Sequence, residues 1–157
     1  MIHTKAIAPI KSNNKDYLVF LGGSIEMGTA DLWQEALVES FIDFPDNLVL
    51  LNPRRDDWDS SWPQDPAVGT NFEQQVTWEL EAQEKADLLV YFFDAKTKSP
   101  ITLLELGTFG YSNPKRTIVC CPKEFYRYGN VAIFCNRYGI TLVHSLNELI
   151  NTIKKRV

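Results

Sequence analysis

The sequence predicts an α/β protein in which a five-stranded parallel sheet is covered by helices on both faces. Short apolar runs of strand length alternate along the chain with longer segments of helical period, and this alternation is typical of parallel sheets. The apolar runs contain few polar residues, as expected for strands that are buried on both faces. With 157 residues, 45% of them hydrophobic, the chain is long enough for one domain with a substantial core.

Five apolar segments are predicted as strands, at residues 17–21, 47–51, 88–93, 116–121 and 141–144. We expect them to pair in the order 2-1-3-4-5, which makes a doubly wound, flavodoxin-like sheet. Residues 1–15 are polar and mixed, so they are predicted to be a loose N-terminal arm before a single domain over residues 16–157. Ligands of such sheets bind beyond the carboxyl ends of the strands, so the segments that follow the strands are the candidate site.

A glycine turn follows the first predicted strand. Gly22 and Gly23 stand directly before Ser24, and a helix is expected to begin at about Asp31. Glycines between a strand and a helix let backbone N–H groups approach a phosphate or a sugar. Residues 22–28 match neither the dinucleotide-binding fingerprint nor the P-loop, which argues against dinucleotide binding and nucleoside triphosphate hydrolysis. A tight turn without a ligand is the alternative interpretation.

A long irregular segment, residues 54–66, follows the second predicted strand. Irregular connections of this length are more often functional than idle in compact domains. The segment contains Arg54, Asp57 and Trp58, and we expect it to be a lid whose aromatic rings stack on a flat nucleobase. The alternative is that its tryptophans only anchor the loop to the rest of the protein.

Residues 70–86 are predicted as a helix that begins with a capping box at Thr70 and Glu73. Counting by helical period places Glu79 on the apolar stripe of this helix, together with Gln83. A carboxylate on a core-facing stripe needs a partner or a chemical role. Glu79 is therefore a candidate catalytic acid, and a hydrogen bond to a neighbouring loop is the alternative.

The segment 99–107 follows the third predicted strand and is expected to begin a helix, with Ser99 as N-cap and Pro100 as first helical residue. Glu105 lies one turn into this helix, with apolar residues four positions before and after it. A solvated helix face carries several polar residues, and here few are present. This acid is a candidate catalytic carboxylate, and an ordinary surface glutamate is the alternative.

An aromatic-rich segment, residues 124–138, follows the fourth predicted strand and contains a short helix near residues 130–137. Ser145 and Glu148 predict the capped start of a final helix. A small domain would have difficulty covering so many aromatic side chains by itself. We therefore expect a homo-oligomer whose interface includes residues 125–134.

The composition excludes several classes of partner. The net charge is −4 and the basic residues are scattered, which argues against nucleic acid as a partner. No apolar run is long enough to span a membrane and residues 1–12 lack the apolar region of a secretory signal, so a cytoplasmic protein without a membrane partner is expected. The three cysteines and two histidines lack metal-ligand spacing, which predicts buried, reduced thiols, no metal site and no cofactor.

Three of these segments together resemble the nucleoside 2-deoxyribosyltransferase family, in particular its short nucleoside 2-deoxyribosyltransferase-like branch. They are Phe-Leu-Gly-Gly-Ser-Ile at residues 20–25, the run over residues 78–90, and residues 99–107, in which Glu-Leu-Gly closes the motif. The similarity extends over residues 17–144. It implies an enzyme of nucleotide salvage that acts on a small-molecule nucleoside or nucleotide and a free nucleobase.

The resemblance also implies roles for individual residues. Glu105 corresponds to the glutamate that attacks the anomeric carbon, while Ser24 and Ser99 correspond to polar residues near the sugar or its 5′ group. Glu79 stands where the family usually has Asp, and Asp94 is the nearest counterpart of an acid before the nucleophile loop. The candidate catalytic residues are Glu105, Glu79 and Asp94. The candidate substrate-binding residues are Gly22, Gly23, Ser24, Ile25, Arg54, Asp57, Trp58, Trp78, Ser99 and Asn130, the last lent by a neighbouring subunit.

Cleavage of an N-glycosidic bond requires one carboxylate facing the anomeric carbon and a second acid that protonates the leaving base. Glu105 and Glu79 are expected to take these roles, with transfer of the deoxyribosyl group to another base through a covalent glycosyl-glutamate. Two alternatives stay open. One is hydrolysis of a nucleoside or nucleoside monophosphate, and the other is a nucleotide-binding module without chemistry.

Overall fold

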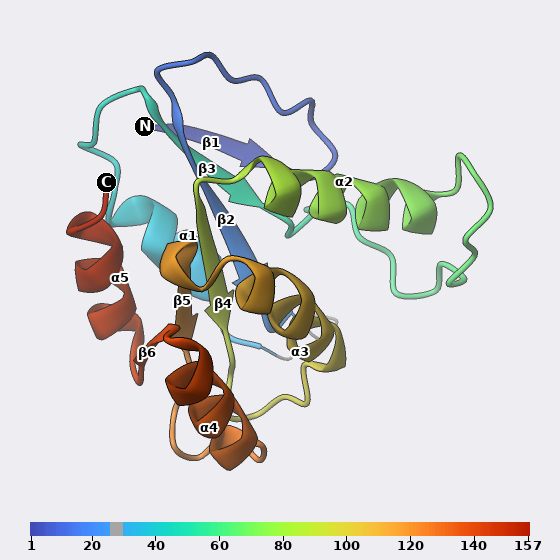
Figure 1. The fold of residues 1–157 in the computed structure, drawn as a ribbon. Helices are drawn as coiled ribbons and strands as arrows, with labels where there is room; N and C mark the ends of the chain where they lie inside the picture. Colours follow the sequence, from blue (N-terminus) through green and yellow to red (C-terminus); the bar gives the residue numbers. More distant parts are fainter. Residues whose placement is uncertain (26–29) are drawn as a thin grey trace.

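The computed structural model describes residues 1–25 and 30–157 and contains a six-stranded parallel sheet in these residues (Figure 1). The strands lie in the order β1-β3-β2-β4-β5-β6, and every neighbouring pair is parallel. Their bounds are β1 (Ile2–Lys5), β2 (Tyr17–Gly23), β3 (Leu48–Asn52), β4 (Leu88–Phe92), β5 (Thr117–Cys120) and β6 (Thr141–Val143). The α/β class and the parallel sheet are confirmed.

The prediction of five strands is wrong because Ile2–Lys5, expected in a loose arm, forms an additional edge strand along β3. The amide of Ala6 continues this attachment with a hydrogen bond to the carbonyl of Asn52 at 3.0 Å. The N-terminal ammonium group of Met1 donates to the carbonyl of Phe44 at 2.6 Å. A short, partly exposed edge strand lacks the continuous apolar run that marks a buried strand, so the pattern missed it. Without β1, the remaining strands follow the predicted order.

Helices cover both faces of the sheet (Figure 1). The helices α1 and α5 contribute to one hydrophobic core, and α2, α3 and α4 contribute to the core on the opposite face. Their bounds are α1 (Trp33–Glu39), α2 (Asn71–Lys85), α3 (Pro100–Glu105), α4 (Tyr128–Tyr138) and α5 (Leu146–Lys154), with a π-helical turn η2 (Leu106–Gly110) after α3 and a 3₁₀ turn η3 (Pro114–Arg116).

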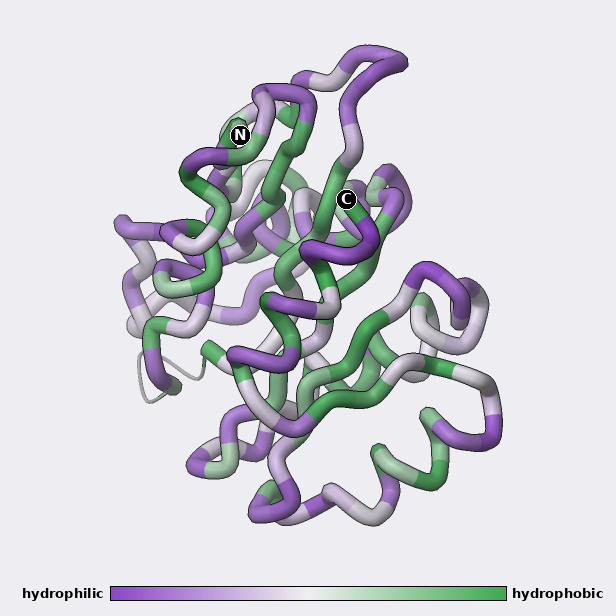
Figure 2. The backbone as a smooth tube through the Cα atoms, turned by 90° about the vertical axis from the view of Figure 1, so that its left-hand side faces the viewer, coloured by the Kyte–Doolittle hydropathy of each residue, from purple (hydrophilic) through white to green (hydrophobic). Residues whose placement is uncertain are grey.

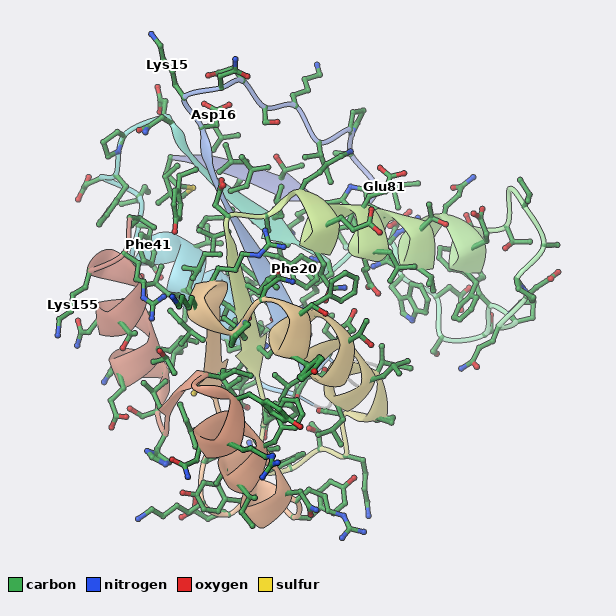
Figure 3. The ribbon with its side chains drawn as sticks, in the orientation of Figure 1. Lys15, Asp16, Phe20, Phe41, Glu81 and Lys155 are labelled. Carbon is green, nitrogen blue, oxygen red and sulfur yellow. The ribbon has the colours of Figure 1, made fainter. Side chains whose placement is uncertain are left out.

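Alternate residues of the central strands separate the two cores. Leu18 and Phe20 of β2 face α2 and its neighbours, whereas Val19 and Leu21 face α1 and α5. Figure 2 shows hydrophobic residues gathered along the inner segments of the chain and hydrophilic residues on the outer loops. In Figure 3, Phe20 lies between the sheet and the covering helices, and Glu81 points outward from α2.

The capping residues expected for two helices are confirmed. Thr70 accepts a hydrogen bond from the backbone N–H of Glu73 at the start of α2, at 3.1 Å. Ser145 accepts one from Glu148 at the start of α5, at 3.3 Å. These bonds satisfy N–H groups that have no partner within the helix, and they explain why the two boundaries could be placed from local sequence.

The three cysteines are buried and free, as the sequence predicts. Burial raises the pKa of each of these thiols to about 12, so they are unreactive at neutral pH. Over residues 1–25 and 30–157, no group of three histidine, cysteine or acidic side chains is arranged to hold a metal ion. Within the same residues, no helix is both long and apolar enough to cross a membrane.

Candidate active site

Two carboxylates from separate helices lie on the face of the sheet that α2 and α3 cover, close enough for the charge of one to act on the other. Glu79 lies in the middle of α2 and Glu105 is the last residue of α3. A hydrogen bond from the side-chain Nε2 of Gln83 in α2 to Oε1 of Glu105, 2.9 Å long, joins the two helices. The segments that sequence analysis singled out independently are thus adjacent in space.

Glu105 is partly buried, and its surroundings disfavour the charged form. Loss of solvation raises the pKa of Glu105 to about 8, with a further contribution from the charge of Glu79. The hydrogen bond from Gln83 acts in the opposite direction, because an N–H donor stabilises the ionised carboxylate. A carboxylate with a pKa perturbed to this extent, beside a second acid, is typical of catalytic sites.

Gln83 is a site residue to which sequence analysis assigned no role. Its side chain is fully buried, and its Oε1 accepts a hydrogen bond from the hydroxyl of Tyr91 in β4 at 2.7 Å. With the Tyr91 hydroxyl donating to its oxygen, the amide directs its Nε2 toward Glu105. The helical period places Gln83 one turn after Glu79, on the same side of the helix. A buried amide one turn from a buried acid is the sequence feature that could have revealed the role of Gln83.

Glu79 is held by a neighbour on its own helix. The Nε2 of Gln75 donates to Oε1 of Glu79 at 2.6 Å and also to the backbone carbonyl of Pro53 at 2.8 Å. Loss of solvation raises the pKa of Glu79 to about 7, and the hydrogen bond from Gln75 opposes this shift. Glu79 can therefore carry a proton near neutral pH, which is what a general acid requires.

Ser24 and Ser99 come together at the ends of β2 and β4, but inside the protein. Only 1% of Ser24 and 3% of Ser99 is exposed, and their hydroxyls are hydrogen-bonded to each other and to the hydroxyl of Thr97. Ser99 does not use its side chain as the expected N-cap of α3 and instead adopts a left-handed conformation, with φ of 49°. This conformation directs its hydroxyl into the cluster formed by Ser24, Thr97 and Ser99.

Asp94 lies beside the cluster formed by Ser24, Thr97 and Ser99 and makes hydrogen bonds with backbone N–H groups. Its carboxylate accepts hydrogen bonds from the N–H groups of Asp31 at 3.0 Å and Lys96 at 2.8 Å, and its own N–H donates to Ser24 at 2.9 Å. In the described part of the chain, no hydrogen bond joins Asp94 to either Glu79 or Glu105. Through these contacts, Asp94 connects the segment before α1 to the segment after β4.

Gly22 and Gly23 permit close packing at the end of β2. A Cβ on Gly23 would lie 2.5 Å from the carbonyl oxygen of Phe92, and its φ of 151° is one that other residues rarely adopt. A Cβ on Gly22 would lie 2.7 Å from the ring of Phe20. These contacts account for both glycines without a ligand. Ile25 is half-buried, and residues 26–28 of the expected turn lie outside the described residues.

The segment between β3 and α2 extends past the start of α2 in Figure 1 and is organised by charge and aromatic contacts. Arg55 binds Asp57 with two hydrogen bonds, of 2.8 and 2.7 Å, and stacks over Trp62 at 5.0 Å. Trp58 contacts Trp62 edge to face, with 5.3 Å between the ring centroids. These contacts support anchoring of the loop by its tryptophans. A pocket of about 270 Å³ lies beside them, lined by Trp62, Pro63, Gly69, Thr70, Asn71 and Phe72.

Arg54, Trp78 and Asn130 occupy different environments. Trp78 is 7% exposed, packs in the core, and donates its indole N–H to the carbonyl of Ala8 at 2.8 Å. It thus attaches the N-terminal segment to α2. Asn130 is exposed near the start of α4. Arg54 follows β3, and its Nη1 is buried without a hydrogen-bond partner.

Comparison with known proteins agrees with this fold. A conserved protein from Enterococcus faecalis V583 has a similar crystal structure, with a TM-score of 0.64 over 90% of this chain and 99% of that chain. Its sequence identity is 16%, so the similarity concerns the fold. No curated protein matches the chain at a significant level.

The profile described as nucleoside 2-deoxyribosyltransferase like matches residues 16–125. This range contains both candidate carboxylates and the loop that follows β3. It covers well over half of the chain, and it supports a role in nucleoside processing. The chain therefore belongs to the nucleoside 2-deoxyribosyltransferase-like family.

Proposed function

We propose that this protein cleaves the N-glycosidic bond of 2′-deoxynucleosides and transfers the deoxyribosyl group to another base through a covalent intermediate on Glu105. The observation that supports this best is the contact from Gln83 to Glu105 beside a second acid, Glu79. One carboxylate is held in place by an amide donor, and the other has a pKa near neutrality. This is the pair of groups that glycosyl transfer through a covalent intermediate requires.

In the proposed reaction, the oxygen of Glu105 that Gln83 does not contact attacks the anomeric carbon. The bond from this carbon to the base breaks, its electron pair leaves with the base, and Glu79 supplies the proton. A second base then attacks the same carbon, Glu105 leaves, and Glu79 takes up the proton that the incoming base loses. Atoms and charges balance over the two steps without a cofactor.

The two acids titrate as a pair, because the charge of one raises the pKa of the other. The reactive form has Glu105 ionised and Glu79 protonated, so the pair carries one proton. With pKa values of about 8 for Glu105 and about 7 for Glu79, the pair carries one proton near neutral pH. That proton lies mainly on Glu105, so the reactive arrangement is the minor form of the pair. Activity is therefore expected to be bell-shaped in pH, with its maximum between about 7 and 8.

We further propose that the protein works in the cytoplasm as a homo-oligomer, with Asn130 at the interface. Leu104 of α3 is 65% exposed, Ile133 of α4 is 72% exposed, and Tyr111 contacts Tyr138 of α4 with 4.9 Å between the ring centroids. Exposed apolar side chains on α3 and α4 favour protein contacts. Light scattering at micromolar concentration tests this, and a monomer mass would contradict it.

Incubation with one deoxynucleoside and a different free base tests the chemistry. Transfer produces the exchanged nucleoside, hydrolysis produces free deoxyribose, and a binding module without chemistry produces neither. A 2-fluoro-2-deoxynucleoside destabilises the oxocarbenium-like state and should leave a sugar-sized mass on the peptide that contains Glu105. An adduct on another residue would contradict the assignment of the nucleophile.

A further inference from the structure

Arg54 and Arg55 lie shortly after the end of β3, and each has one buried guanidinium nitrogen that makes no hydrogen bond. The side chain of Arg55 is only 5% exposed, and its Nε and Nη2 are engaged by Asp57. Its Nη1 is buried and has no hydrogen-bond partner, and the same is true of the Nη1 of Arg54. Buried donors are normally hydrogen-bonded, and these two have no such bond within the protein, so each lacks an acceptor that a ligand could supply.

A buried acceptor without a partner lies on the adjacent helix. Gln75 is 6% exposed, and its Nε2 contacts both the carbonyl of Pro53 and the carboxylate of Glu79. Its Oε1 is buried without a partner. Because Pro53 directly precedes Arg54, this glutamine connects the segment that carries the arginines to the candidate general acid.

The spacing along α2 relates these groups to the reacting carbon. Gln83, Glu79 and Gln75 are successive residues four apart, so they lie on one side of the helix, about 6 Å apart along its axis. Gln83 contacts Glu105, where the anomeric carbon is bound under the proposed function. Gln75 lies two turns further along, so a base that extends from the sugar past Glu79 directs its far edge toward Gln75.

We propose that Arg54, Arg55 and Gln75 bind the far edge of the nucleobase and select bases that present a carbonyl oxygen beside a ring N–H. Hypoxanthine, guanine, uracil and thymine have this edge. The arginine N–H groups donate to the carbonyl oxygen, and the amide oxygen of Gln75 accepts from the ring N–H. This inference rests on the proposed function and names the substrate class of the same site.

Adenine and cytosine carry the opposite pattern. Their edge presents an amino donor and a bare ring nitrogen, so the amino group would face the arginine donors and the ring nitrogen would face the acceptor of Gln75. Both sets of protein groups would stay unpaired in a buried place, and sites of this kind discriminate strongly against such ligands.

The arginines also fit the chemistry of the leaving group. When the bond from the anomeric carbon to the base breaks, the electron pair stays on the base and is delocalised to its carbonyl oxygen. Guanidinium donors at that oxygen stabilise the developing charge before Glu79 delivers its proton. A phosphate group would match the arginine donors, but it offers no donor to the oxygen of Gln75. The combination of donors and acceptor therefore favours a base.

The test compares kcat/KM for deoxyinosine with that for deoxyadenosine, and for deoxyuridine with that for deoxycytidine. We expect the carbonyl-bearing substrate to be preferred at least about 10²-fold in both pairs. Arg54→Met should reduce this preference at least tenfold by lowering kcat/KM for the carbonyl-bearing substrates, and Arg54→Lys should reduce it less. Lys85→Met is the matched control, since it removes an exposed cation of α2 and should leave the preference unchanged.

Calorimetry of hypoxanthine and adenine with the Glu105→Ala protein separates this inference from the proposed function. Preferential hypoxanthine binding that Arg54→Met abolishes supports the inference, even in a protein that exchanges no nucleoside. Exchange activity with equal kcat/KM for both substrate classes overturns the inference and leaves the proposed function standing. Binding of inorganic phosphate that depends on Arg54, without any preference among bases, would also overturn it and indicate an anion site.

Discussion

The hydroxyl cluster of Ser24, Thr97 and Ser99 differs in how its groups are satisfied from the polar row, which is formed by Gln75, Glu79 and Gln83 of α2 with Glu105 of α3. In the cluster, the hydroxyls of Ser24, Thr97 and Ser99 bind one another. In the row, Glu79 and Glu105 are desolvated together, and the pKa of each is raised. A cluster of hydroxyls that are hydrogen-bonded to one another stabilises the fold. Buried acids whose lost solvation is only partly replaced by hydrogen bonds tend to exchange protons or react.

The contrast predicts that substitutions in the polar row reduce activity without loss of the fold, and the largest effect is expected for Glu105→Ala. Loss of the nucleophile should reduce base exchange by at least about 10⁴-fold. Removal of a desolvated acid should leave the thermal midpoint unchanged or slightly raised. Exchange assays with circular dichroism check both parts. Ordinary activity in this variant would eliminate Glu105 as the nucleophile.

Glu79→Gln is expected to have the next largest effect, a decrease in kcat of about 10²–10⁴-fold, because general acid catalysis is typically of this size. The pH profile should change in shape. The alkaline limb should disappear because no proton is lost from residue 79, and a single acidic limb, set by the ionisation of Glu105, should remain. A profile unchanged in shape would show that Glu79 takes no part in proton transfer.

Gln83→Met should have an intermediate effect, a decrease in kcat of about tenfold near neutral pH. The variant loses the donor that lowers the pKa of Glu105, so the pKa rises and the acidic limb should move to higher pH. Tyr91→Phe keeps the amide but removes the hydroxyl that orients it, and should shift the limb less. Equal decreases at all pH values would indicate a structural role alone.

Ser24→Ala tests the other side of the comparison and should have the smallest effect on chemistry. It removes an acceptor for the N–H of Asp94 and for the hydroxyl of Thr97, which should lower the free energy of unfolding by about 1–3 kcal/mol. The expected change in kcat is less than about tenfold. Urea denaturation and steady-state kinetics measure the two quantities. A stable variant with a large loss of kcat would mean that Ser24 contacts the substrate.

The sequence by itself determined the features that depend on local pattern. Apolar runs and their alternation with helical segments predicted a parallel α/β sheet, because strands buried on both faces leave continuous apolar runs in the chain. Thr70 and Ser145 marked helix starts because a capping side chain acts within one turn. Glu79 and Glu105 were found because each acid interrupts an apolar helical face.

Only the tertiary structure decided which distant residues became partners. The placement of Tyr91 and Gln83 behind Glu105, of Asp94 against backbone amides, and of Trp78 against Ala8 depends on contacts between separate elements. The short strand β1 likewise exists because β3 offers it an edge. Burial and hydrogen bonding across elements arise from packing, and packing leaves no periodic record in the local sequence.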